Sequence, residues 1–363
     1  MKIAIIGSGG VGGYFGARLA AGGEDVTFVA RGAHLEAMQK NGLKVLSALG
    51  DLHLPKVKAT SDTKTIGPVD VVLIAVKLWA TEEAAAAAKP LIGPNTVVVS
   101  FQNGVIAVDT LVPVLGKAHV MGGVSNIAAL IEEPGVIRHN GNMANLFFGE
   151  LDGKPSARSQ AFYDVCKKAG ISTHLVDDIH GAIWEKFVRL VTLSAMTSLT
   201  RMPVGAIRSD PDTRALMQQV MEEVVAIGRA KGAKLDANIV ADQMSKVETY
   251  PATMVASMCG DLRRGNRLEL PWLSGMVANY GRDLGIPTPA NQFVYTALKP
   301  LRQRSPRRSA DLKQVGSRRT QRAQRKANEP KLFIHGTNVP VMLISVFLCA
   351  LCVLCGKDFL EEI

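Results

Sequence analysis

A lysine and a glutamate in the second half of the chain have side chains suited to proton chemistry. Lys186 stands in an apolar segment of helical pattern, beside Ile183 and Phe187, so its ammonium group either extends to solvent or points into a cleft. Glu269 lies between leucines just before Pro271, where a carboxylate either stabilises the start of a helix or pairs with a lysine in a catalytic site. The residues alone leave both alternatives open.

Polar residues also follow two apolar runs in the first half of the chain. Lys77 follows the run at 71–76, and Asn103-Gly104 follows the run at 97–100. In open α/β sheets, ligands bind beyond the carboxyl ends of the strands. A lysine there can bond a cofactor ribose or a substrate carboxylate, and an asparagine can hold a nicotinamide. Asn103-Gly104 is equally typical of a plain turn.

A glycine-rich string follows the first apolar run. The string Gly7-Ser8-Gly9-Gly10-Val11-Gly12 has the spacing G-x-G-x-x-G between a predicted strand and a predicted helix. There the first glycine permits a tight turn, the second lets the backbone approach a pyrophosphate, and the third lets helix and strand pack closely. The helix N-terminus also attracts the phosphate charge. The predicted dinucleotide-binding residues are Gly7, Ser8, Gly9, Gly10, Val11 and Gly12.

The residue after the second apolar run indicates which dinucleotide binds. NAD-binding proteins place an acidic residue there to bond the ribose 2′-hydroxyl, whereas here Val29-Ala30 is followed by Arg31. A guanidinium fits a 2′-phosphate better than a ribose diol. NADP(H) is therefore the predicted cofactor, and a plain surface arginine is the alternative.

Short apolar runs alternate with helical patterns over residues 1–125. The expected strands are 3–6, 26–30, 69–76, 96–100 and 119–124. The expected helices between them are 11–21, 34–40 and 81–91. This alternation predicts an α/β fold with a doubly wound parallel sheet of the Rossmann type. Further strands are expected at 135–139 and 145–149.

Beyond about residue 180 the pattern becomes helical throughout. The expected helices are 181–199, 211–231, 238–248 and 270–284. Prolines and glycines separate them. We predict a Rossmann-type NADP-binding domain at 1–175, an all-helical substrate and catalytic domain at 176–300, and a basic tail at 301–363.

Composition excludes several classes of protein. The chain has 363 residues, of which 47% are hydrophobic, enough for two domains with their own cores and too many for a disordered or collagen-like chain. The formal charge of +10 comes mainly from residues 301–363, which hold 12 basic and 5 acidic residues. No recognition motif accompanies them, so nucleic acid is not an expected partner. The seven histidines show no ligand spacing, so no metal site is expected. Two widely separated cysteines before residue 300 and the absence of a secretory signal indicate a cytoplasmic protein.

The tail ends in an apolar segment at 339–355 that contains Cys349, Cys352 and Cys355. As a helix it would span about 26 Å, against a hydrocarbon core of about 30 Å. It is therefore a marginal membrane anchor, and its cysteines are weak candidates for acylation or metal binding. We favour a third interpretation, that the tail does not belong to the working protein, because composition changes abruptly at Pro300-Leu301.

Together these strings resemble the ketopantoate reductase (2-dehydropantoate 2-reductase) family from residue 1 to about 300. The strings that carry the resemblance are the glycine string, Arg31, Val76-Lys77-Leu78-Trp79, Gln102-Asn103-Gly104, Trp184-Glu185-Lys186 and Ser257-Met258…Asp261…Glu269. The resemblance implies NADPH-dependent reduction of a small-molecule 2-keto acid to a 2-hydroxy acid, on the route to pantothenate and coenzyme A.

The resemblance also implies residue roles. Lys186 would protonate the substrate oxygen, with Glu269 as its partner. A lysine partly removed from water has a lowered pKa and donates a proton more readily, and its charge stabilises charge that develops on oxygen. The implied substrate contacts are Asn103, Ser257 and Ser194. The implied cofactor contacts beyond the glycine string are Arg31, Lys77, Asn103 and Gly104.

Three positions depart from the family's pattern. Leu190 and Ser194 stand where asparagines often face the substrate, and Pro271 stands where an aspartate is common. Leucine makes that wall of the cleft more apolar, so a related 2-keto acid with a bulkier or less hydroxylated side chain is an alternative substrate. An NADP-binding sensor without turnover and another NADP-linked hydroxyacid dehydrogenase are alternative functions. A homodimer is left open.

Overall fold

The computed structural model describes residues 1–303. Most of the predicted tail, including the apolar segment at 339–355 and its cysteines, lies outside the described residues.

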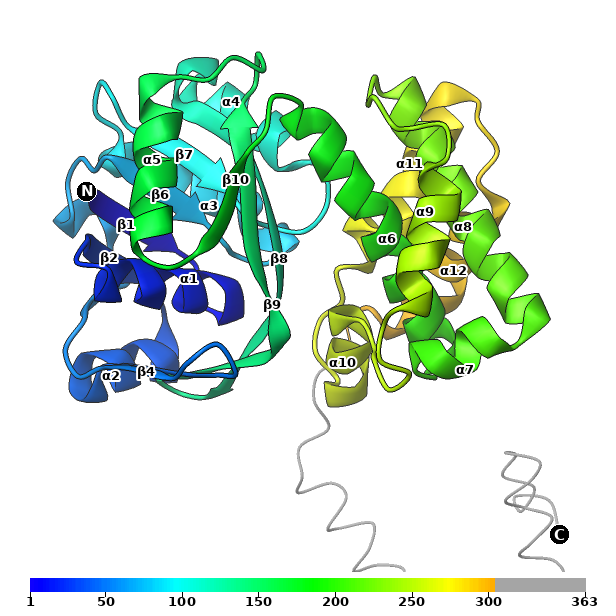
Figure 1. Ribbon diagram of the computed structural model, residues 1–363, viewed down its shortest axis with the longest axis horizontal. Coiled ribbons are helices and arrows are strands. Elements are labelled where there is room, and N and C mark those ends of the chain that lie inside the picture. Colours follow the sequence, from blue (N-terminus) through cyan, green and yellow to red (C-terminus); the bar gives the residue numbers. More distant parts are fainter. Residues whose placement is uncertain (304–363) are drawn as a thin grey trace, which may run out of the picture. The chain divides into compact units, whose positions relative to one another are not determined.

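Ten strands form one mixed sheet in the first half of the chain (Figure 1). They are β1 (Lys2–Ile6), β2 (Asp25–Val29), β3 (Leu43–Ser47), β4 (Leu52–Leu54), β5 (Lys58–Thr60), β6 (Val71–Ile74), β7 (Val97–Ser100), β8 (Val120–Glu133), β9 (Val136–Glu150) and β10 (Ser172–Leu175). Their order is β4-β3-β9-β8-β7-β6-β1-β2-β5, with β10 beside β9. The run from β8 through β7, β6, β1 and β2 to β5 is parallel, which confirms the predicted Rossmann-type sheet.

Helices cover both faces of the sheet. They are α1 (Gly10–Ala21), α2 (Gly32–Asn41), α3 (Thr81–Ala88), α4 (Ala107–Leu115) and α5 (Ala157–Lys168). Alternate strand residues point to opposite faces. Accordingly, Ile3 and Ile5 pack with α1, α2 and α5, whereas Ala4 and Ile6 pack with α3 and α4. Burial on both faces explains why the central strands are continuous apolar runs in the sequence.

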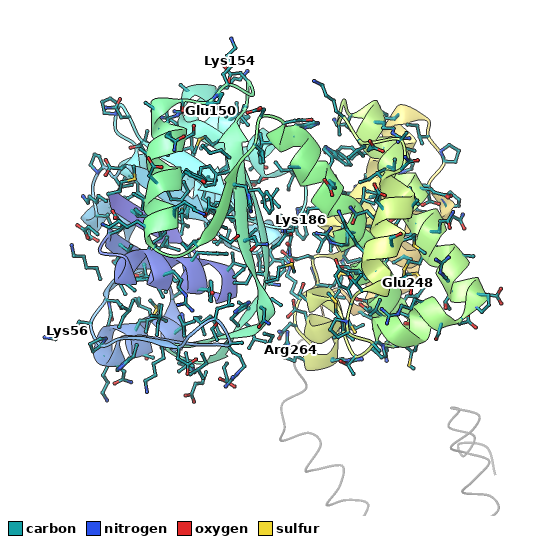
Figure 2. All side chains as sticks on the ribbon, in the orientation of Figure 1. Lys56, Glu150, Lys154, Lys186, Glu248 and Arg264 are labelled. Atoms are coloured by element: carbon teal, nitrogen blue, oxygen red, sulfur yellow. The ribbon has the colours of Figure 1, made fainter. Side chains whose placement is uncertain are left out.

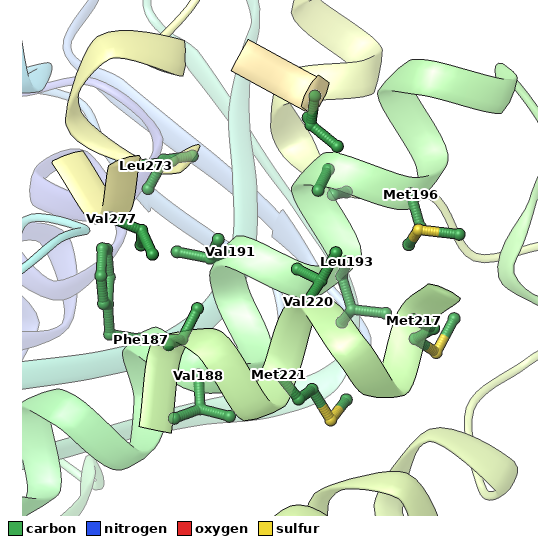
Figure 3. Close-up of a cluster of buried hydrophobic side chains, with 14 of the residues drawn as sticks. Phe187, Val188, Val191, Leu193, Met196, Met217, Val220, Met221, Leu273 and Val277 are labelled. Carbon is green, nitrogen blue, oxygen red and sulfur yellow. The ribbon is translucent and has the colours of Figure 1, made fainter. Parts of the chain in front are cut away.

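The second half of the described chain is helical, as predicted. Its helices are α6 (Ile179–Thr200), α7 (Val204–Ser209), α8 (Pro211–Ala230), α9 (Ile239–Glu248), α10 (Ser257–Arg264), α11 (Ser274–Leu284) and α12 (Pro289–Leu298). Its core is built around α6, whose Phe187, Val188 and Val191 pack with Val220 of α8 and Val277 of α11 (Figure 3). Because one side of α6 is buried in this core, the helix is a rigid support for the polar side chains on its other side.

The region between 119 and 150 corrects the sequence analysis. The strands expected at 135–139 and 145–149 are both part of β9, which pairs with an equally extended β8 as an antiparallel hairpin. The expectation failed because residues 140–143 are exposed and fall where the register of the pair shifts. Asn140, Gly141 and Asn142 interrupt the apolar pattern although the strand continues.

Two helix boundaries were also predicted wrongly, and each lies beside a proline. The helix expected at 270–284 begins only at Ser274, after a 3₁₀ turn that contains Pro271. The helix expected at 81–91 ends at Ala88, before a 3₁₀ turn that contains Pro90. Pro90 lacks the amide hydrogen that a continuing helix needs, which explains the end of α3; the start of a helix does not need that hydrogen, so Pro271 does not explain the late start of α11 in this way. The elements that were not predicted at all are β3, β4, β5, β10, α4, α5, α7, α10 and α12.

None of the helices within residues 1–303 is long and apolar enough to cross a membrane. In the same part of the chain, no group of three or more His, Cys, Asp or Glu side chains is arranged to hold a metal ion.

Candidate active site

Lys186 extends from α6 to the loop that follows β7. Its Nζ donates a hydrogen bond of 3.1 Å to the Asn103 side-chain oxygen, and Figure 2 shows Lys186 between the helices of the second half and the sheet. The start of α6 is fixed by Asp178, whose carboxylate accepts a bond from the Gly181 amide at 2.9 Å. The structure therefore brings together two predicted site residues that lie in different halves of the chain.

The surroundings of Lys186 favour loss of its proton. The pKa of this lysine falls from 10.5 to about 8, mainly because the side chain is buried and in smaller part because of the charge of Arg189, while the charge of Glu269 partly opposes both. An ammonium group with a pKa near 8 remains mostly protonated at neutral pH and is a much stronger acid than an ordinary lysine.

Glu269 forms its direct ion pair with Lys77, not with Lys186. The carboxylate is 5% exposed; one oxygen lies 3.5 Å from Lys77 Nζ and the other accepts a 3.1 Å hydrogen bond from the Leu78 amide. Glu269 acts on Lys186 through its charge, so the partner role implied by the family resemblance stays a prediction, while the ion pair with Lys77 was not expected. The physical reason is that Glu269 lies against the loop after β6, which carries Lys77.

Asp261 is a further member of this ion cluster, and the sequence analysis gave it no role. It accepts hydrogen bonds from Lys77 Nζ at 2.9 Å, from Arg264 at 2.9 Å and from the Asn266 amide at 3.0 Å. Burial opposes the charge of both Lys77 and Asp261, but the pairing outweighs it: the pKa of Lys77 is raised by Glu269 and Asp261, and the pKa of Asp261 is lowered by Lys77. Lys77 is thus held as a cation by two carboxylates.

Two buried polar side chains position the loops that carry Lys77 and Asn103. Gln102 donates to the Val76 carbonyl at 3.0 Å and to the Thr81 hydroxyl at 2.9 Å. The Ser125 hydroxyl donates to the Phe101 carbonyl at 3.0 Å. These bonds link the ends of β6 and β7 to the middle of β8, so they hold the two loops in place relative to each other.

An aromatic stack joins the same two halves beside the ion cluster. The rings of Trp79 and Trp272 lie 6.4 Å apart between centroids. The Arg267 guanidinium lies 4.7 Å from the Trp79 ring and 5.6 Å from the Trp272 ring. Stacking of a cation on aromatic faces adds to the stability of this contact.

The glycine string forms the turn that its spacing predicts. Gly7 adopts φ +95°, and a Cβ on Gly12 would lie 2.3 Å from the Gly7 carbonyl oxygen, whereas a Cβ on Gly9 would meet open space. Helix α1 begins at Gly10 without a side-chain cap. Open space beside an uncapped helix N-terminus fits a pyrophosphate group. The Ser8 hydroxyl donates to the Val29 carbonyl at 3.1 Å, so its side chain supports the turn.

His34 clamps this turn to the β8–β9 hairpin. Its Nε2 lies 2.9 Å from the Ser8 carbonyl oxygen, and its Nδ1 accepts a 3.0 Å hydrogen bond from the Gly135 amide. Because Nδ1 is an acceptor, Nε2 carries the hydrogen and donates to Ser8. Burial lowers the pKa of this imidazole, which keeps it neutral as the geometry requires. The sequence analysis missed His34 because no motif marks it.

Arg31 lies on the surface just after β2, where the sequence placed it. It pairs with Glu83 of α3, and the two side chains are 69% and 60% exposed. An exposed pair of this kind is weak, so the guanidinium can exchange its carboxylate partner for a phosphate.

The remaining predicted residues lie in different surroundings. Ser257 is exposed in the first turn of α10. Ser194 is fully buried, and its hydroxyl has no hydrogen-bond partner within residues 1–303. Leu190 packs partly buried against the helical core. The structure thus leaves Ser257 accessible and gives no support to a substrate contact by Ser194.

A cavity of about 530 Å³ lies next to the site, between α4 and the start of α6. The residues that line it include Val105, Asp109, Ile183, Trp184 and Tyr280. A much smaller hollow of about 10 Å³ shares Val105 and Ile183 with it and reaches Gln102 and Gly104. Neither is lined by Lys186, Asn103 or Glu269, so the hydrogen bonds rather than these hollows locate the site.

Comparison with known proteins gives consistent results for both halves. Residues 3–153 match the family Ketopantoate reductase PanE/ApbA, and residues 178–302 match its C-terminal family. A 2-dehydropantoate 2-reductase of Mesorhizobium japonicum is 34% identical, covering 83% of this chain and 98% of the relative. A PanE/ApbA family ketopantoate reductase from Ralstonia eutropha is 33% identical, with a TM-score of 0.77, covering 83% of this chain and 98% of that one. D-Mandelate dehydrogenase with NADH and anilino(oxo)acetate has the same fold at 20% identity, with a TM-score of 0.77 over 83% of this chain and 98% of that one.

Proposed function

Because the chain belongs to the ketopantoate reductase family, we propose that it reduces 2-dehydropantoate, or a related 2-keto acid, to the 2-hydroxy acid with NADP(H). The contact of Lys186 with Asn103 between the two halves, at a lysine whose pKa is about 8, is the observation that carries the proposal. The product would enter pantothenate and coenzyme A synthesis.

In this proposal Lys186 supplies the proton. The nicotinamide would supply hydride to the ketone carbon when bound. The Lys186 ammonium group then donates its proton to the ketone oxygen, and its charge stabilises the negative charge that develops there. Asn103 orients the ammonium group through its side-chain oxygen.

Glu269 and Asp261 act by holding Lys77. Both carboxylates bind Lys77, and Glu269 also binds the Leu78 amide, so the loop after β6 is tied to the helical half. We assign Lys77 a cofactor contact, and we assign Glu269 the role of keeping Lys77 in place. The charge of Glu269 also keeps the pKa of Lys186 from falling further.

The preference for NADP(H) rests on Arg31 and the glycine turn. The residues fit the cofactor: Gly7 forms the turn, the space beside Gly9 is open and the first turn of α1 has no side-chain cap. Arg31 would bind the 2′-phosphate in place of Glu83. Replacing Arg31 with Ala should reduce the preference for NADPH over NADH by roughly 10- to 100-fold, since a charge-assisted contact is removed.

We propose a 2-keto acid as the reacting group of the substrate, but we leave more than one side chain open. Leu190 and Ser194 offer no amide donors to hydroxyl groups of the substrate, and the leucine adds apolar surface. We therefore propose 2-dehydropantoate or a 2-keto acid with a less hydroxylated side chain. Within residues 1–303 the cysteines, Cys166 and Cys259, are both free, which is consistent with the proposed reducing cytoplasm.

The test is NADPH oxidation by the full chain with a panel of 2-keto acids. The panel contains 2-dehydropantoate, 2-oxoisovalerate, pyruvate and phenylglyoxylate, each measured with NADPH and NADH. We expect turnover with at least one acid and faster reaction with NADPH. Tight NADPH binding without turnover on any acid would instead favour a sensor of the same fold.

A further inference from the structure

Three cationic side chains are linked to the candidate site by their contacts or charges, and they differ in how their charge is balanced. Lys77 is neutralised by Asp261 and Glu269. Lys186 is the proton donor of the proposed reaction and bonds a neutral amide. The third cation is Arg189, one turn further along α6, and neither the family resemblance nor the sequence analysis gave it a role.

Arg189 is partly buried and bonds two neutral side-chain amides. One guanidinium nitrogen donates to the Gln243 oxygen at 2.9 Å, and another donates to the Asn126 oxygen at 3.4 Å. Within residues 1–303 none of the ion pairs at 4.0 Å or less involves Arg189. A partly buried charge normally has a charged partner. Arg189 is therefore positioned without being neutralised.

The partners of Arg189 are themselves held in place. Gln243 is completely buried, and its amide nitrogen donates to Glu185 at 3.1 Å, which turns its oxygen toward Arg189. Asn126 follows Ser125, the residue that bonds the Phe101 carbonyl next to the loop of Asn103. The guanidinium thus lies between α9 and the middle of β8, close enough to Lys186 for its charge to act on it.

We infer that Arg189 binds the carboxylate of the 2-keto acid substrate. This inference rests on the proposed function and deepens it, because it explains how the acid is recognised where Leu190 and Ser194 offer no amide. The guanidinium has a planar set of donors that matches a carboxylate, and two amide oxygens hold that set in place. An anion bound to the Arg189 guanidinium would supply the negative counter-charge that no residue within 1–303 supplies.

The position of Arg189 also links binding to proton donation. The charge of Arg189 lowers the pKa of Lys186, and a carboxylate bound to Arg189 would oppose that effect. Lys186 is therefore more fully protonated when the substrate is in place, which is the state that a proton donor needs.

The first experiment compares an acid with its neutral analogue. The full chain and its Arg189→Gln variant are assayed with the fastest 2-keto acid of the panel and with the corresponding 2-keto carboxamide. We expect the substitution to raise KM for the acid roughly 10- to 100-fold and to leave KM for the carboxamide within about twofold. An equal change for both compounds, or no change for either, overturns the inference.

A second measurement does not depend on turnover. Oxamate, which has a carboxylate beside a carbonyl, is titrated into each protein with NADP⁺ present, and binding is followed by calorimetry. Arg189→Gln should weaken oxamate binding at least tenfold, Arg189→Lys should weaken it less, and NADP⁺ affinity should be unchanged. Lys246→Gln, which removes an exposed cation from the same polar network, is the matched control and should bind oxamate like the unaltered chain.

The outcomes separate this inference from the proposed function. Oxamate binding that depends on Arg189, in a protein that reduces no 2-keto acid, supports the carboxylate site and overturns the reductase. Turnover that Arg189→Gln leaves unchanged supports the reductase and overturns the carboxylate site. Failure of both turnover and oxamate binding overturns both. Thermal melting of each variant checks that the fold is retained.

Discussion

Lys77 and Lys186 lie at the same contact between the two halves of the chain, yet their surroundings are opposite. Two carboxylates surround Lys77 and raise its pKa, whereas Lys186 has a neutral amide partner and a neighbouring cation, and its pKa falls to about 8. A lysine that is neutralised by buried carboxylates stabilises a structure, and a lysine that is left without a counter-charge is available for chemistry. The contrast predicts opposite effects for the same substitution.

The largest expected effect is on turnover. Lys186→Met should lower kcat roughly 100- to 10,000-fold, because the proton donor is lost, and should leave NADPH affinity within about twofold. Steady-state kinetics and cofactor titration measure the two quantities. Lys246→Met, on the exposed side of α9, serves as the control. Turnover above a tenth of the original value in Lys186→Met would contradict the proposed role.

The same substitution at Lys77 should mainly affect stability. Lys77→Met leaves the buried carboxylates of Asp261 and Glu269 without their shared cation. Removing one partner from a buried pair costs about 3–5 kcal/mol; because the Lys77 side chain is 44% exposed, we expect a loss of about 2 kcal/mol. Urea unfolding measures this. Adding Asp261→Asn to the variant should recover part of the loss, and an unchanged free energy of unfolding would show that the cluster is not stabilising.

The pH dependence of the reaction should reflect the lowered pKa of Lys186. The donor must be protonated, so kcat should fall about tenfold per pH unit above roughly pH 8, provided that proton transfer limits the rate. A substrate carboxylate bound to Arg189 would move this fall in kcat to a higher pH. Rates measured from pH 6 to 10 with saturating substrate test the prediction, and a rate still level at pH 10 would place the proton donor elsewhere.

The smallest expected effect is a gain in stability from Lys186→Met. Because the folded-state pKa of Lys186 is below its unfolded value, the folded state binds fewer protons between about pH 8 and 10.5. Holding this lysine charged therefore opposes folding below pH 8, and the penalty is relieved as pH rises through that range. The variant should be more stable than the unaltered chain by about 1 kcal/mol at pH 7, and the gain should shrink toward pH 10.5. A loss of stability at pH 7 would contradict this assignment.

The parts of the fold that could be predicted from the sequence are those with a local signal. The strands β1, β6 and β7 are buried on both faces, so their apolar runs are unbroken. β3, β4 and β5 are short and partly exposed, and α4 contains Pro113, so each lacks the pattern that marks its type. The β8–β9 hairpin was not predicted as one pair of long strands, because its exposed stretch at 140–143 interrupts the apolar pattern of β9.

The site shows the same division between local and distant information. The glycine turn is a feature of consecutive residues and could be predicted from them, whereas the apolar helix around Lys186 left its direction open and only the family resemblance gave it a role. The pairing of Glu269 with Lys77 could not be predicted, because the sequence offers two lysines and only packing decides which is nearer. Asp261 and Arg189 were not recognised since their significance lies in their partners, which are distant in the chain.

The tryptophans of the stack described above provide an optical reporter of the two halves. The chain contains three tryptophans, of which Trp184 is 2% exposed inside the helical core, while Trp79 and Trp272 belong to opposite halves. Indole emission overlaps the absorption band of reduced nicotinamide, so quenching by energy transfer depends on how near the dinucleotide lies to each indole. Fluorescence of the unlabelled protein, with Trp79→Phe and Trp272→Phe to assign the signal, can therefore follow cofactor arrival and the separation of the halves in real time.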